Sequence, residues 1–225
     1  MTTTIPRTLL FLAACSLLPT ACAKKTDATA ANFTAAMSRY LEKRGDLCLG
    51  KSVWPIDVTE GEAQSGARNA VQMPALESLG LVSASDADAD VKTEDGTVRV
   101  KVTRYQLTAA GERYYLTRET EGLTKSGEKA TEGDFCAAKL SLDRVVGWEL
   151  GEGPHPQAVV TYTYRVDAPD WAKTSEARRV FPAVARVIDG EGMAQMKEGF
   201  TRAESGWVAN ELSPGPDLVA QKSSR

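Results

Sequence analysis

Histidine is almost absent from this chain of 225 residues, which contains a single one, His155. A hydrolase with a serine or cysteine nucleophile and a histidine base would have to use that residue. His155 lies in "GEGPHPQ" (151–157), where the glycines and prolines predict an exposed turn. An exposed turn suits a general base poorly, so we expect no catalytic role for His155 and identify no catalytic residue in the chain.

Cysteine is also scarce, with four residues and no C-x-x-C pair. A structural zinc site needs about four ligands, and beyond residue 22 the chain offers only Cys48, Cys136 and His155 besides its carboxylates. A redox-active dithiol would need two cysteines close together in the chain. We therefore expect neither a zinc site nor a redox site.

An acidic stretch, "SASDADADVKTEDG" (83–96), is the nearest approach to a calcium loop. Asp86, Asp88 and Asp90 fit positions 1, 3 and 5 of such a loop, but Val91 and Thr97 stand where glycine and glutamate are required. We expect an exposed polar loop here. Phosphate-binding and dinucleotide-binding motifs are missing as well, so the sequence predicts no metal and no cofactor.

Basic charge is not in excess, because 27 lysines and arginines face 30 aspartates and glutamates. The formal net charge is −3. A protein that binds nucleic acid neutralises phosphates with a surplus of basic side chains, so we expect no nucleic-acid partner.

Long apolar runs are missing after the N-terminus, which itself has the layout of a secretory signal. Arg7 precedes an apolar stretch at residues 9–18, which is too short to span a membrane. The sequence "LLPTAC" resembles a bacterial lipobox, in which the cysteine is lipidated and becomes the first mature residue. This resemblance implies a signal peptide over residues 1–21 and a lipid on Cys22. "LAAC" ending at Cys15, or ordinary cleavage within "ACA", are alternatives, and all three predict export.

The first folded element is expected to be a helix. Five apolar residues follow helical spacing, with Asn32 as a possible N-cap and Gly45 as the end: Phe33, Ala36, Met37, Tyr40 and Leu41. The small polar residues 22–31 before it predict a flexible tether. Residues 213–225 predict a disordered tail.

Residues 67–116 combine a helical stretch, the acidic loop, an alternating strand "TVRVKVTRYQL" and a short helix in "TAAGERYYL". This order, with the pattern Y-x-L-T-x-x-G-x-x-Y, resembles the second half of a winged-helix module. The resemblance implies that Thr108 caps the closing helix and that four residues pack inward: Leu76, Leu79, Leu81 and Val82. The helix before the wing is not basic and the loop is acidic, and such a surface would repel phosphate, so DNA binding ranks last among the possible roles. We therefore expect a structural or protein-binding unit over residues 32–119.

Residues 133–212 predict an antiparallel β domain. Strands are expected at 138–150 and 158–166, where Val160, Tyr162, Tyr164 and Val166 share one face. A short helix is expected over 168–181, and further strands in "PAVARVID" (182–189), "AQMKEGFTRA" (194–203) and "GWVANEL" (206–212). The fold class is thus α+β, a winged-helix-like N-terminal part followed by an antiparallel β-meander with a helical insertion.

The heptapeptide "GDLCLGK" (45–51) has a near copy, "GDFCAAK" (133–139). In an oxidising compartment the two remaining cysteines most often pair, so we expect a Cys48–Cys136 disulfide between the two halves. Lys51 and Lys139 would either share an anion site beside it or, as we favour, point outward from their strands. The stretch "APDWA", with Asp170 and Trp171, is the expected partner contact, because that tryptophan could be exposed.

Six stretches together resemble a group of uncharacterised proteobacterial envelope lipoproteins: "CLGKSVWPIDV", "QMPALESLGLV", "YQLTAAGERYY", "FCAAKLSLDRVVGW", "VTYTYRVDAPDWA" and "ESGW". The resemblance implies the location and architecture but no activity. We expect an exported protein at the periplasmic face of the outer membrane, anchored through Cys22, with a non-catalytic binding or structural role and another envelope protein or a small ligand as its partner. The alternatives are a periplasmic hydrolase that uses carboxylates and a secreted inhibitor or immunity factor.

Overall fold

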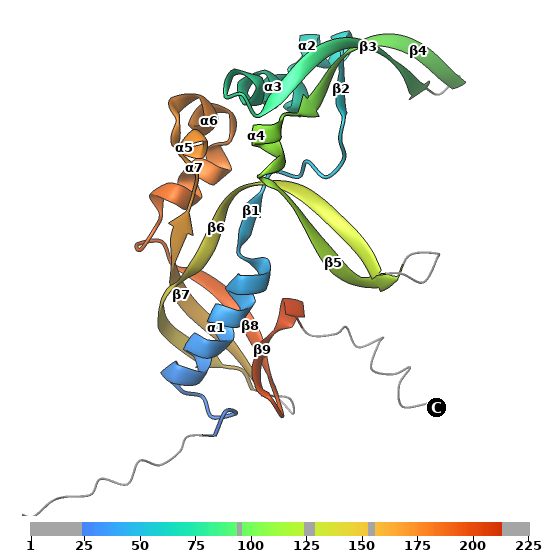
Figure 1. Cartoon of the computed structure of the whole chain (residues 1–225). Coiled ribbons are helices and arrows are strands. Elements are labelled where there is room, and N and C mark those ends of the chain that lie inside the picture. The colour runs from blue at the N-terminus through green and yellow to red at the C-terminus, as the bar shows by residue number, and fades with distance from the viewer. Residues whose placement is uncertain (1–23, 94–95, 124–128, 153–155, 213–225) are drawn as a thin grey trace, which may run out of the picture.

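The computed structural model describes residues 24–93, 96–123, 129–152 and 156–212, and shows an α+β chain with antiparallel sheets (Figure 1). A six-stranded sheet has the order β1-β6-β7-β8-β9, with β5 also paired to β6, and a three-stranded sheet has the order β2-β4-β3. The strands are β1 (Asp46–Cys48), β2 (Ile56–Thr59), β3 (Val82–Thr93), β4 (Gly96–Leu107), β5 (Tyr115–Leu123), β6 (Lys129–Leu150), β7 (Gln157–Asp167), β8 (Met196–Ala203) and β9 (Gly206–Ala209). The helices are α1 (Ala30–Arg44), α2 (Glu60–Ser65), α3 (Arg68–Ser78), α4 (Ala109–Glu112), α5 (Asp170–Lys173), α6 (Ser175–Val180), α7 (Pro182–Asp189) and the 3₁₀ turn η1 (Asn210–Leu212).

Helix α1 forms where the apolar spacing predicts it, and all five predicted apolar residues are buried. Its N-cap is Thr29, whose side chain accepts a hydrogen bond from the backbone N–H of Asn32, so the assignment of Asn32 as cap was wrong by three residues. The Asn32 side chain instead donates to the carbonyl oxygens of Lys24 and Asp27. Residues 24–29, expected to belong to a flexible tether, are thus hydrogen-bonded to the first turn of the helix.

One core lies between α1 and the large sheet. Phe33 is fully buried, with its ring 4.9 Å from that of Trp207 on β9 and 5.1 Å from that of Trp148 on β6. Trp207 Nε1 donates to the carbonyl oxygen of Asp27, which joins the start of the helix to the last strand. The N-terminal helix is therefore packed on the C-terminal sheet.

A second core surrounds α3, which contacts α6 of the C-terminal half. Met73 and Leu76 on α3 and Phe135 on β6 are fully buried there, and Trp171 from α5 packs in the same core. Elements from both halves of the sequence thus contribute to each core, and the cores do not follow the boundary expected near residues 119–133.

The acidic stretch is a strand rather than the expected loop. Residues 82–93 form β3, which pairs with β4 in register from Val82–Leu107 to Thr93–Gly96. The alternation of aspartates with alanines has the period of two that strands require, and it matches the alternation of basic residues and valines in β4. The segment 120–132, which lies between the two expected units, is also part of a hairpin as far as it is described, because β5 extends to Leu123 and β6 begins at Lys129.

The C-terminal strands β6, β7, β8 and β9 pair in chain order, as a meander does, with helices α5 to α7 inserted between β7 and β8 (Figure 1). The expected strand at 182–189 is helix α7, so that prediction was wrong. Pro182 occupies its first turn, where a missing N–H costs nothing, and Val184 and Ala185 face the core. In the described ranges, none of the helices is long and apolar enough to cross a membrane.

Candidate functional site

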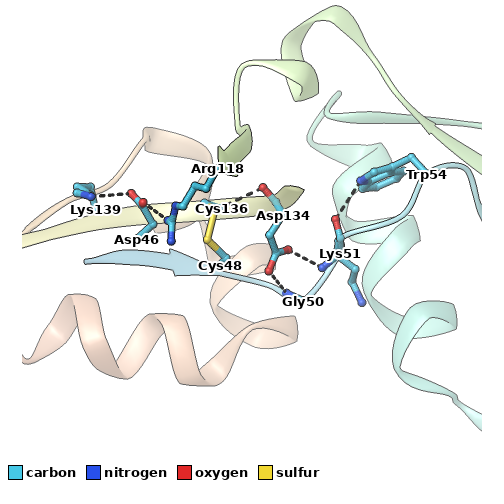
Figure 2. The surroundings of a disulfide bond; sticks show 9 residues. All are labelled: Asp46, Cys48, Gly50, Lys51, Trp54, Arg118, Asp134, Cys136 and Lys139. Atoms are coloured by element: carbon cyan, nitrogen blue, oxygen red, sulfur yellow. Dashed lines mark hydrogen bonds and ion pairs between the residues drawn. A yellow bond between two sulfur atoms is a disulfide. The ribbon is translucent and has the colours of Figure 1, made fainter. Parts of the chain in front are cut away.

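The two copies of the heptapeptide lie side by side, because β1 pairs with β6 in antiparallel orientation (Figure 2). Cys48 lies opposite Cys136, and the two form the disulfide expected from the sequence. The register shifts between Leu47 and Cys48, as it does at a β-bulge. This shift brings cysteine opposite cysteine at the centre of the paired repeat.

Asp46, from the first copy, is surrounded by cations. Its carboxylate forms an ion pair of 3.2 Å with Lys139 of the second copy and another with Arg118 on β5. The Asp46 side chain is only 10% exposed, whereas Lys139 and Arg118 are each 37% exposed. Lys139 Nζ also donates to the carbonyl oxygen of Glu42 at the end of α1. This group therefore fastens α1, β1, β5 and β6 to one another.

Asp134, at the matching position of the second copy, binds backbone instead. Its carboxylate accepts hydrogen bonds from the backbone N–H groups of Lys51 at 2.6 Å and Gly50 at 3.1 Å. Gly50 has φ of +69°, a conformation that glycine adopts without a steric penalty. The Asp134 carboxylate thereby fixes the turn through which the chain leaves β1 for the small sheet.

Lys51 is buried, with 4% of its surface exposed, so the expectation that it points outward was wrong. Its ammonium donates to Asn69 Oδ1 on α3 at 2.5 Å. Burial lowers the Lys51 pKa to about 8, and the positive charge of Arg68 adds to this effect, while Asp134 opposes it. Lys51 and Lys139 each have a protein oxygen of their own, which argues against a shared anion site.

A groove lies between helices α2 and α3 and the small sheet. It encloses about 540 Å³. The groove is lined by segments that are far apart in the sequence. Its apolar wall consists of Val58, Ala63, Ala70, Pro74, Ala87, Val102 and Tyr105. Its polar rim consists of Thr59, Glu60, Asp86, Asp88, Lys101 and Thr103. Three carboxylates and one ammonium on the rim favour a cationic ligand with an apolar part.

The groove was not predicted from the sequence, although one signal could have indicated it. Asp86 and Asp88 are two residues apart on β3, so they lie on the same face of the strand. The same face of β2 carries Val58, which is buried against α3. When the buried face of a strand carries acidic residues past the point where a short helix covers it, the pattern indicates a groove with a charged rim.

A second group of titratable residues lies at the large sheet. Tyr40 Oη donates to Glu211 Oε2 at 3.2 Å. Burial raises the pKa of Tyr40 above its usual range and raises the pKa of Tyr162 to about 12. Burial also raises the pKa of the Glu198 carboxyl, and the negative charge of Glu211 adds to this increase. Neither Glu198 nor Glu211 lines the groove.

The two residues of the expected partner contact, Asp170 and Trp171, differ in their exposure to solvent. Trp171 is 9% exposed and its ring packs edge-on against Tyr114 at 5.6 Å and near Phe135 at 5.8 Å. Trp171 is therefore a core residue, which corrects the expectation that it is exposed. Asp170 beside it is exposed. Cys22 and His155 lie outside the described residues.

The structure supports no calcium interpretation of the aspartates on β3. Asp88 lies opposite Lys101, and Asp90 forms an exposed ion pair with Arg99 at 3.9 Å. Within the described part of the chain, no three histidines, cysteines or carboxylates are close enough together to hold a metal ion.

No protein-family model, curated protein or solved structure matches this chain.

Proposed function

We propose that the protein is exported, is anchored at the periplasmic face of the bacterial outer membrane by a lipid on Cys22, and binds another envelope protein without catalysing a reaction. The observation that carries the binding role is the groove between α2, α3 and the small sheet, with its apolar wall and acidic rim. The disulfide and the contacts of Asp46 and Asp134 hold this groove on the large sheet.

The proposal includes a winged-helix-like unit that serves for protein contact. Its support is the element order β2, α2, α3, β3, β4 and the strand order β2-β4-β3. Thr108 accepts a hydrogen bond from the Gly111 N–H as an N-cap, while Leu76, Leu81 and Val82 are buried and Leu79 is partly buried. The rim of the groove, with three carboxylates and one ammonium, would repel phosphate, so the unit is suited to a basic protein surface.

The lipid anchor is tested by treating the producing bacteria with globomycin, which blocks the peptidase that acts on lipidated precursors. Accumulation of a larger precursor, together with its loss in a Cys22→Ala variant, would support the anchor. A Cys15→Ala variant is the control that separates the two cysteines. Unchanged migration in the presence of the drug would refute lipidation.

The binding role is tested by placing a photo-crosslinking amino acid at Ala63, which lines the groove, in cells that produce the protein at its natural level. The matched control site is Ala183, an exposed alanine on α7 outside the groove. A defined adduct from position 63, absent from position 183 and lost with Asp88→Lys, is expected. If position 63 gives no adduct, the groove does not carry the binding role.

A further inference from the structure

Strand β3 lies at the edge of the small sheet and pairs with β4 along one side only. It has twelve residues and extends away from the helices together with β4 (Figure 1). A long edge strand presents backbone N–H and C=O groups to which another strand can bind. What this edge can bind is decided by the direction of its backbone groups and by its side chains.

The direction of the backbone groups follows from one hydrogen bond. The Ala84 N–H donates to Glu77 Oε1 on α3 at 3.3 Å, so it points away from β4. In an antiparallel ladder this direction recurs at every second residue. The outward N–H and C=O groups after Ala84 therefore belong to Asp86, Asp88 and Asp90, and no described residue binds them.

The side chains of this edge separate into two faces. Asp86 and Asp88 lie on the face that lines the groove, and Ala89 and Val91 lie on the other. On its inner side β3 already pairs with β4, and the side chains of β4 show which kind of strand suits this pattern. Strand β4 places Lys101 opposite Asp88 and Arg99 opposite Asp90, and places Val100 and Val98 opposite Ala89 and Val91.

We propose that the outer edge of β3, at residues 86–90, binds an extended segment of a partner protein in which lysine or arginine alternates with valine-like residues. The segment adds to the small sheet as a fourth strand, next to β3. Its basic side chains lie on the groove face, where Asp86, Asp88 and Glu60 supply negative charge. The proposal rests on the binding role proposed above and names the chemistry of the partner.

A second copy of the same chain is a poor occupant of this edge. If two β3 strands pair in antiparallel orientation about Asp88, the aspartates of one lie opposite the aspartates of the other. Like charges directly opposite each other destabilise a strand pair. The aspartates thus work against self-association while leaving the edge open to a basic strand.

The probe is a capped, fluorescent peptide with the sequence TVRVKVT, which repeats residues 97–103, titrated with the purified protein and followed by fluorescence anisotropy. We expect saturable binding, and binding weaker by about tenfold or more for the control peptide TVEVEVT. A peptide methylated on the backbone nitrogens that would face β3 should also bind at least about tenfold more weakly, because it cannot donate to the edge.

Two substitutions at one position separate charge from backbone. Asp88→Asn should weaken binding by up to about fivefold, as expected for one exposed charge. Asp88→Pro should weaken it further, because it also removes an outward N–H while sparing the ladder to β4. Asp167→Asn, at an exposed position of β7 outside the groove, is the matched control and should bind as the unsubstituted protein does. Circular dichroism and thermal unfolding check that each variant is folded, and the methylated peptide needs no variant.

Three results would overturn the proposal. The acidic peptide TVEVEVT could bind as tightly as TVRVKVT, or the methylated peptide could bind as tightly as the unmethylated one. Sedimentation could also show a concentration-dependent dimer of the protein whose dissociation constant is changed by Asp88→Asn. If the peptide does not bind but the crosslink from Ala63 persists, the edge inference fails and the binding role stands. If both are missing, both fail.

Discussion

Asp46 and Lys139 lie opposite each other on β1 and β6 and form an ion pair of 3.2 Å. They occupy the second and seventh positions of the two copies of the repeat. The reciprocal pair, Asp134 and Lys51, is also in contact, but there the aspartate binds the backbone N–H and the ammonium turns away to Asn69. Two similar heptapeptides that pair in antiparallel orientation therefore meet with approximate two-fold symmetry about their disulfide, and each aspartate contacts the lysine residue of the other copy.

Loss of the disulfide is predicted to destabilise the protein by about 4 to 5 kcal/mol, because the bond closes a long loop between residues 88 positions apart. The measurement is urea unfolding of the protein and of a Cys48→Ser/Cys136→Ser variant, with and without reductant. Reductant should affect only the protein with both cysteines. Mass spectrometry of a nonreduced digest should find the linked peptide, and free thiols at both positions would contradict the structure.

Asp46→Asn is predicted to cost about 1 to 3 kcal/mol in the free energy of unfolding, since it removes the negative charge between Lys139 and Arg118 in a largely buried place. The control is Asp90→Asn, which breaks an ion pair to Arg99 whose side chains are 63% and 70% exposed and should cost less than about 1 kcal/mol. Equal effects of the two substitutions would show that the Asp46 contacts do not stabilise the packing of α1, β1, β5 and β6.

Lys51 is predicted to make stability depend on pH between 8 and 10.5. Its pKa in the folded protein is about 8, below the ordinary value of 10.5, so as pH falls through this range the unfolded chain takes up a proton that the folded chain does not. This contribution to stability is therefore present above pH 10.5 and lost as pH falls to 8. Between pH 7 and pH 9.5, the free energy of unfolding should rise by about 2 kcal/mol more in the protein than in a Lys51→Met variant.

Both proteins share all the other titrating groups, so the contribution of these groups cancels in the difference between the two stability curves. The variant leaves Asn69 Oδ1 without its donor, but that loss does not change with pH. Parallel stability curves for the two proteins would mean that Lys51 keeps an ordinary pKa and is accessible to water.

Trp171→Ala is predicted to destabilise the protein by about 3 to 5 kcal/mol, as truncation of a large core side chain does. Asp170→Asn, at the exposed neighbouring position, should change stability by less than about 0.5 kcal/mol. Thermal and urea unfolding measure both. A Trp171→Ala protein of normal stability that no longer binds its partner would restore the interpretation of Trp171 as a contact residue.

Periodic apolar spacing was sufficient to predict several elements. Phe33 to Leu41 predicted α1. The alternation in β7 predicted one packed face, on which Val160, Tyr162 and Tyr164 are at most 3% exposed and Val166 is partly buried. These predictions succeeded because burial against one partner surface imposes a period on the sequence. The opposite face of β7 was less simple, since Thr163 is 1% exposed and donates to Asp143 at 2.8 Å.

Short apolar stretches were ambiguous, and α7 shows why. "PAVARVID" contains β-branched residues typical of strands, but Phe181, Val184, Ala185 and Ile188 have the spacing i, i+3, i+4, i+7 of a helix. The helical spacing becomes visible only when Phe181, outside the expected segment, is included. In β3 the error was the reverse, because polarity was taken to indicate a loop although the period was that of a strand.

The candidate site depended on tertiary contacts that no local pattern encodes. The disulfide could be predicted by counting cysteines, but the burial of Lys51 depends on Asn69, 18 residues further along the chain. The groove likewise requires β2, β3, β4 and two helices to be placed together before it exists.

The packing of α1 on β9 has a consequence for the order in which the protein can be assembled. Asp27 and its hydrogen-bonded partner Trp207 are separated by 180 residues, and Phe33 reaches its aromatic neighbours on β8 and β9 only after those strands have been made. The first helix in the described part of the chain is thus among the last to be buried. Contacts between such distant residues form slowly, so the core between α1 and the large sheet is completed only after nearly all of the chain has been synthesised.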